Sequence, residues 1–361
     1  PAAASDYTGA EPYGELMKRT LQQASATLVR DLAPKLLEKA STDNEKADLE
    51  FAAADAIKVI GRATKDTDLL RQYEAKLKEL QEKYPNHGRA SLAGINQIES
   101  AKARGLAIIG QATEAQDDAE RQKLIAKGRG ELENMIASCK KVVEEQNKVV
   151  GDLLAIEQKA KRLDQVPEEQ QHQRLRAENQ RDLTQFFLAD GYVTLARTYI
   201  GDEHKAKRKE LLDGAKSAYS LLIEGSDDRA GTSNDVLRNM SYIGQIETMI
   251  DLEDYDEAIG LATDLTYIDL WYDPGHVPDS YKPQIPKDLD HVRQICINAH
   301  ILLVKALVKT NKGEEALQVA LGIDSKPHGK NWRDHPMGLL LVFERAKALA
   351  GAGQGERGAG E

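Results

Sequence analysis

The chain has 361 residues, of which 41% are hydrophobic and 30% are charged, so it can bury a core and is long enough for two domains or one extended repeat array. Its formal net charge is −10, and no basic stripe interleaves with aromatic residues, which argues against nucleic-acid binding because the phosphate backbone is itself negative. No apolar run approaches the ~18 residues that a membrane span needs, so we expect no transmembrane segment.

The composition predicts the fold class. Ala, Leu, Glu, Lys and Gln are abundant, whereas aromatic residues make up only 5% of the chain. The abundant residues are strong helix formers, and the residues that favour strands are too sparse for a large sheet. We therefore expect an all-α protein.

The N-terminal part is predicted to be a flexible arm, residues 1–14, followed by helical hairpins in residues 15–112. In the first helix, leucines such as Leu28 and Leu32 recur at helical spacing until Pro34, which should break or restart the helix. A second helix follows the cap-like Ser-Thr-Asp at residues 41–43. A third helix has the clearest pattern, with apolar residues three or four apart: Leu70, Tyr73, Leu77, Leu80 and Tyr84.

The middle of the chain, residues 113–165, is predicted to be one long helix or helical rod. No proline interrupts residues 117–164, and at about 1.5 Å per residue this segment would be on the order of 70 Å long. Gly128, Gly130 and Gly151 could each kink or end the helix, so two shorter helices are the alternative. Residues 166–182, with Pro167 and a Glu/Gln run, are the expected linker.

The second half, residues 183–350, contains antiparallel helical pairs, and residues 351–361 form a Gly-rich tail that we expect to be flexible. The pairs are predicted to begin near residues 186, 235, 290 and 336, with tight turns at 252–254 and 311–313. The last helix, residues 338–350, carries an apolar run at 339–343 that the tail cannot cover. We expect this face to meet a partner, a second copy or further chain.

Two of these turns resemble the tetratricopeptide repeat (TPR), whose second helix opens with a Gly-x-Tyr-x-x-Ala type of signal. Residues 253–258 read Glu-Asp-Tyr-Asp-Glu-Ala, and residues 312–316 read Lys-Gly-Glu-Glu-Ala. Residues 73–87 resemble the helix ends of bacterial-envelope proteins of this family. The pairs lie about fifty residues apart instead of roughly 34, and the first-helix Trp-Leu-Gly signature is absent or out of register. The resemblance implies a divergent TPR-like α-solenoid with insertions, whose concave surface binds other proteins.

Three surfaces are candidates for protein binding. Two loops, at residues 271–283 and 326–336, combine aromatic side chains, histidines and prolines, and they could either recognise a partner or fill gaps between repeats. The third surface is the uncovered face of the last helix, where self-association is the other possibility. The candidate residues are Trp271, Tyr272, His276, Tyr281, His328, Trp332, His335, Leu340 and Phe343.

No pattern typical of catalysis is present, such as a nucleophile elbow, a phosphate loop, a dinucleotide fingerprint or an HExxH helix. The loop histidines lack the spacing of metal ligands on a helix, so we expect neither a metal nor another cofactor. Cys139 and Cys296 fall within apolar helical patterns, which are typical of buried free thiols.

The sequence therefore predicts a non-catalytic scaffold or adaptor that binds protein partners. The alternative is a structural subunit of a larger assembly in the cell envelope. A helical enzyme or small-molecule receptor would need convergent polar groups in a pocket between repeats. The small residues at positions 1–5 favour an exported, periplasmic location over a cytoplasmic one, because a signal-peptidase cut leaves such a start; an artificial boundary would look the same.

Overall fold

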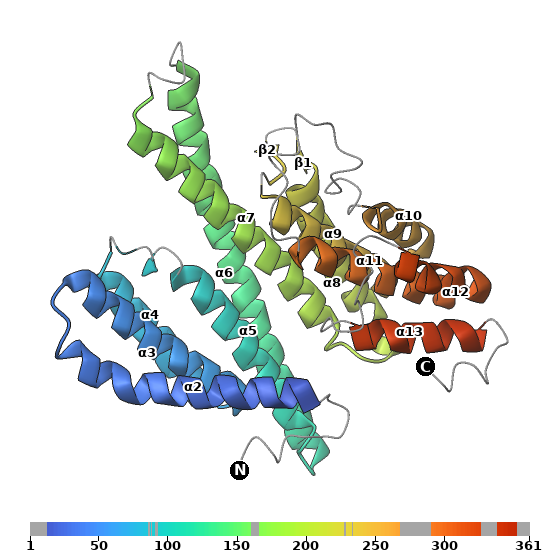
Figure 1. Cartoon of the computed structure of the whole chain (residues 1–361), viewed down its shortest axis with the longest axis horizontal. Helices are drawn as coiled ribbons and strands as arrows, with labels where there is room; N and C mark the ends of the chain where they lie inside the picture. Colours follow the sequence, from blue (N-terminus) through green and yellow to red (C-terminus); the bar gives the residue numbers. More distant parts are fainter. Residues whose placement is uncertain are drawn as a thin grey trace. The chain divides into compact units, whose positions relative to one another are not determined.

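The computed structural model describes residues 13–85, 87, 89–90, 93–159, 166–226, 229–232, 234–267, 290–325 and 338–351. Over these residues the fold is all-helical, as predicted, with twelve α-helices, and within each of the two units described below successive helices pack against one another (Figure 1). The only strands among them are the two-residue β1 (Gly225–Ser226) and β2 (Arg229–Ala230), which pair antiparallel. The chain divides into two compact units, Pro1–Ile200 and Gly201–Glu361.

Each unit is a succession of helices. The first unit contains α2 (Tyr13–Leu37), α3 (Asp43–Ala63), α4 (Thr67–Lys83), α5 (Ala93–Ala112), α6 (Asp118–Lys159) and α7 (Glu168–Ala196). The second unit contains α8 (Lys205–Ile223), α9 (Asp235–Asp251), α10 (Tyr255–Leu265), α11 (Asp290–Lys309), α12 (Gly313–Gly322) and α13 (Gly338–Gly351). Two 3-10 turns, Asp202–His204 and Ile323–Ser325, also belong to the second unit.

The first three helices follow the predicted pattern with one correction. Pro34 does not break α2, because it lies in the last turn and the helix continues to Leu37 before it ends. The expected cap of the second helix is confirmed: the Thr42 hydroxyl accepts from the Glu45 N–H at 3.2 Å, and the Glu45 carboxylate accepts from the Thr42 N–H at 3.1 Å. In α4 the predicted apolar face is buried against α3 and α5.

The long middle helix is confirmed as one piece, α6, of 42 residues. Its glycines do not end it, and Gly128 instead lets α6 approach α5 closely. A Cβ atom at Gly128 would lie 2.8 Å from the carbonyl oxygen of Gly105 and 2.5 Å from Ile109 Cγ1, so only glycine fits there. Nothing lies within 4 Å of the corresponding position at Gly130 or Gly151.

The chain divides at a different place from the expected linker. Most of residues 166–182 is helical, because Pro167 serves as the N-cap of α7 and the Glu/Gln run that follows consists of helix formers. The division falls after Ile200, next to Gly201, whose φ of 103° is open to glycine and disfavoured for other residues. It therefore separates α7 from α8, the two helices expected to form the first repeat pair.

One turn geometry recurs three times, after α3, α9 and α11. In each turn one residue adopts a positive φ: Lys65 (53°), Glu253 (68°) and Asn311 (59°). The N–H of the following residue donates to a carbonyl five residues back, at 2.9 Å in all three turns: Asp66 to Gly61, Asp254 to Met249, and Lys312 to Leu307. The same residue is the N-cap of the next helix, so these three-residue connections make antiparallel hairpins.

In the second unit, alternate helices contact each other as well as their neighbours in sequence. α9 packs against α10 and α11, and α11 packs against α12 and α13. The alanines of the two TPR-like signals, Ala258 and Ala316, are fully buried in a core that also includes Met249, Leu302 and Ala348. The small side chains bring the helices close enough for this shared core to form.

Several predictions about chain ends and cysteines can be placed on this fold. Tyr13 already belongs to α2, and residues 1–12 and 352–361 lie outside the described residues. Cys139 and Cys296 are buried, as predicted, and neither forms a disulfide; burial raises the pKa of the Cys139 thiol to about 12. No helix in the described part of the chain is long and apolar enough to cross a membrane.

Candidate functional site

Of the nine binding residues predicted from the sequence, two can be placed. Leu340 and Phe343 lie three residues apart on α13 and are both exposed, while Leu341 and Ala348 on the same helix are buried. Lys347 Nζ lies 4.2 Å from the centre of the Phe343 ring. The run at 339–343 is therefore only partly exposed, because Leu340 and Phe343 face solvent while Leu341 is buried and Val342 is half-buried. The other seven residues, in the loops at 271–283 and 326–336, lie outside the described residues.

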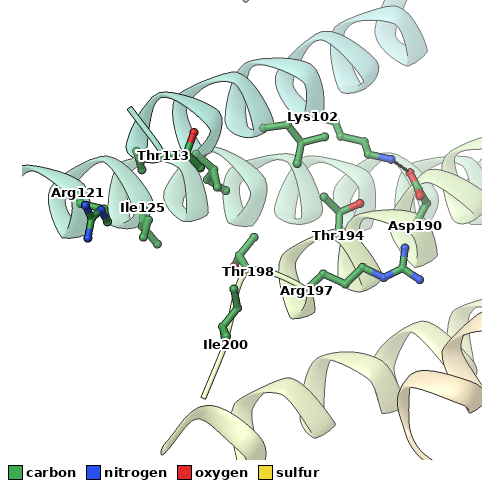
Figure 2. A pocket seen from close by; sticks show the side chains of 12 residues that line it. Lys102, Thr113, Arg121, Ile125, Asp190, Thr194, Arg197, Thr198 and Ile200 are labelled. Carbon is green, nitrogen blue, oxygen red and sulfur yellow. Dashed lines mark hydrogen bonds and ion pairs between the residues drawn. The ribbon is translucent and has the colours of Figure 1, made fainter. Parts of the chain in front are cut away.

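The sequence did not point to an apolar groove of about 610 Å³ in the first unit, between α5, α6 and the end of α7. Its apolar lining comes from three distant parts of the chain: Leu106 and Ile109 on α5, Ile125 on α6, and Ile200 just beyond α7. Figure 2 shows Ile125 and Ile200 on different parts of the lining, with Arg121 beside Ile125 and with Lys102, Asp190, Thr194 and Arg197 gathered at the other end. No periodic pattern within one helix could have brought these residues together.

One end of the groove is polar. Lys102 on α5 forms an ion pair with Asp190 on α7, and both side chains are half-buried. Thr194 and Arg197 lie at the same end, one turn and two turns further along the chain from Asp190 (Figure 2). At the other end Arg121 donates to Asp118 at 2.6 Å and to the carbonyl of Ala115 at 3.0 Å.

The wall formed by residues 198–200 is held by Arg129. The Arg129 guanidinium donates to the backbone carbonyl of Thr198 and, at 3.1 Å, to the Thr198 hydroxyl. It also stacks on Tyr199, with the guanidinium carbon 3.9 Å from the ring centre. The positive charge of Arg129 also lies near the C-terminal end of α7, where it interacts favourably with the negative end of the helix dipole. Arg129 therefore positions the segment that carries Ile200.

The floor of the groove depends on the close approach of α5 and α6. Gly105 and Gly128 face each other at this crossing, and Leu132 fills the space beside Gly105. Leu106 also lines a second groove, of about 270 Å³, together with residues of α3 and α4 such as Gly61 and Leu70. The exposed leucine thus lines two hollows.

The described residues hold no group of three or more His, Cys, Asp or Glu side chains that could bind a metal ion. The lining of the groove offers apolar contact, together with an ion pair, hydroxyls and the guanidinium groups of Arg121 and Arg197. No protein-family model matches the chain, and a comparison with curated proteins found no significant match.

Proposed function

We propose that this chain is a non-catalytic scaffold that binds other proteins, and that the groove between α5, α6 and the end of α7 holds an apolar segment of the partner. The observation that carries the proposal is the exposure of large aliphatic side chains around a concave surface. Leu106 is 43% exposed and Ile200 is 79% exposed. Covering side chains of this size stabilises a complex by on the order of 1 kcal/mol each.

The exposure of the lining also separates a protein ligand from a small molecule. A volume of about 610 Å³ falls within the range of small-molecule sites, but such sites enclose most of the ligand surface. A groove edged by Ile200, most of which faces solvent, leaves one side of any ligand uncovered. An amphipathic helix suits this shape, since it buries one face and leaves the other in water.

The arrangement of the second unit supports the same class of function. Recurrent three-residue turns, together with contacts between alternate helices, are the features expected of a TPR-like solenoid. Stacked hairpins of this kind leave extended surfaces that grip peptides or domains. We therefore keep the divergent TPR-like solenoid as part of the proposal.

Site-specific photo-crosslinking in the source cells tests the proposal. A photoreactive residue at Leu106 or at Ile200 should give the same protein adduct, whereas the same residue at Ile156, which is exposed on α6 outside the groove, should not. The substitution Leu106→Glu should abolish the adduct at Ile200, and Ile156→Glu should leave it unchanged. Crosslinks to small molecules without a protein adduct would favour the receptor alternative and contradict the scaffold.

A structural subunit of a larger assembly is the second candidate, and the exposed pair Leu340 and Phe343 on α13 favours it. If these residues make an assembly contact, Phe343→Ser should lower the mass of the purified particles seen by light scattering. Leu175→Ser changes a similarly exposed apolar residue on α7 and should not do so. Equal masses for both variants would remove the support that α13 gives to this candidate.

A further inference from the structure

Three leucines of α2, at positions 28, 32 and 36, face away from the helix that it packs against. Ala26 and Ala33 face α3, where Ala26 contacts Ala56 and Ile60. Leu28, Leu32 and Leu36, by contrast, are between 40% and 59% exposed, and Val29 beside them is also exposed. Small residues on one side let α2 approach α3 closely, while the leucines form an uncovered stripe next to that contact.

The spacing of this leucine stripe (Leu28, Leu32 and Leu36) makes it complementary to itself. Leu28 and Leu36 lie four residues on either side of Leu32, which is about 6 Å along the helix in each direction. A two-fold axis perpendicular to α2 at the level of Leu32 therefore superposes the stripe of one copy on that of a second, antiparallel copy. Leu32 then meets Leu32, and Leu28 meets Leu36.

The charges beside the stripe match the same arrangement. Successive residues of a helix are rotated by about 100° around its axis. Lys35 therefore lies about 60° around α2 from Leu32, and Asp31 lies about 100° from Leu32 in the same direction. Ala33 lies about 100° from Leu32 in the opposite direction, on the side that faces α3. A perpendicular two-fold axis brings equivalent flanks together, so Lys35 of one copy faces Asp31 of the other with an offset of about 3 Å. Each contact thus contains two opposite-charge pairs.

Asp31 is available for this role without losing its present neighbour. It accepts from Arg30 Nε at 3.0 Å, and both side chains are about half exposed. A carboxylate can accept from a second cation through its other oxygen. The acidic net charge of the whole chain opposes close approach of two copies, and these reciprocal pairs reduce that repulsion locally.

We infer that the leucine stripe of α2 is a contact surface for a second copy of this chain, joined antiparallel about Leu32. A single helix pair buries less area than a standard stable interface, so the association is weak and depends on concentration. This inference does not rest on the proposed groove, which lies on α5, α6 and α7.

Cysteine crosslinking of the full chain tests the geometry directly. Leu32→Cys should form a disulfide-linked dimer under mild oxidation, because the two-fold axis places residue 32 against itself. Leu28→Cys should crosslink poorly alone and several-fold better when mixed with Leu36→Cys. Leu175→Cys, on an exposed leucine of α7, is the matched control, and the native cysteines are buried and do not compete. A Leu32→Cys yield no higher than that of the control would overturn the inference.

Sedimentation equilibrium provides a second, independent readout. The unmodified chain should approach twice its monomer mass of 39.9 kDa as its concentration rises to several hundred micromolar, and Leu32→Glu should stay monomeric. Asp31→Lys should weaken the dimer, and adding Lys35→Asp should restore it. A chain that stays monomeric throughout, or a dimer lost in Phe343→Glu but kept in Leu32→Glu, would overturn the inference.

Discussion

α2 and α4 belong to the same unit and carry apolar residues at the same helical spacing, but they use them differently. In α4, Leu70, Tyr73 and Leu77 are almost completely buried, because α3 and α5 cover that face. In α2 the corresponding stripe faces solvent, since the helix packs closely on α3 through alanines. Periodicity therefore identifies the apolar face of a helix, whereas the number of neighbouring helices decides whether that face is core or binding surface.

The largest expected effect separates these two faces directly. Leu77→Ala leaves a cavity in the core of the first unit and should lower its free energy of unfolding by about 2–5 kcal/mol. Leu32→Ala on α2 should change it by less than about 0.5 kcal/mol, because the side chain is already in water. Urea unfolding of dilute protein measures both. Similar losses would mean that α2 is covered in solution.

α6 also has a covered and an uncovered position, at two glycines that lie two residues apart. Gly128→Ala should lower the free energy of unfolding by about 1–3 kcal/mol, because the new methyl group meets Gly105 and Ile109 and forces α5 and α6 apart. Gly130→Ala meets nothing within 4 Å and should instead stabilise the helix by up to about 1 kcal/mol. Thermal or urea unfolding compares the two. If both variants gain stability, the close crossing that supports the groove is absent in solution.

A smaller effect distinguishes two aspartates at equivalent positions of the recurrent turn. The Asp66 carboxylate accepts hydrogen bonds from the N–H groups of Asp68 and Leu69, at 2.9 and 3.0 Å. Asp66→Ala should therefore lower the free energy of unfolding by about 1 kcal/mol. The Asp254 side chain makes no such cap, and its Oδ2 lies 3.6 Å from Lys216 Nζ. Asp254→Ala should therefore lower the free energy of unfolding by less than Asp66→Ala does. Equal losses of unfolding free energy would show that the hydrogen-bonded cap does not cause the difference.

The sequence was sufficient wherever one segment determined its own structure. The Thr42 cap, the apolar face of α4 and the turns at 252–254 and 311–313 all rest on residues close together in the chain. The division after Ile200 was not predicted, because Pro167 gave a stronger signal than Gly201 although proline also suits the start of a helix. The groove could not be predicted at all, since its lining depends on how three helices cross.

An ion-pair network that links α4, α5 and α6 allows a last test of how these helices are joined. Arg104 of α5 lies between Glu74 of α4 and Glu131 of α6, and it donates to the Glu131 carboxylate at 2.7 Å. Both Arg104 and Glu131 are largely shielded from water. The hydrogen bond from Arg104 is the main reason why the pKa of Glu131 lies below its ordinary value.

This lowered pKa predicts the direction of a pH effect. In the unfolded chain the carboxyl group of Glu131 has a pKa of about 4.3, and in the folded chain its pKa is lower. As the pH falls through this interval, the unfolded chain binds a proton at Glu131 more readily than the folded chain does. The contribution of Glu131 to the free energy of unfolding is therefore lost as the pH falls. Glu131→Gln should therefore lower the free energy of unfolding of the first unit at neutral pH. The difference from the unmodified chain should become smaller as the pH falls. Glu133→Gln, at an exposed position on the same helix, should cost less at neutral pH. Urea unfolding across this range measures the difference, and a cost of Glu131→Gln that does not change with pH would mean that the pair with Arg104 does not join α5 to α6.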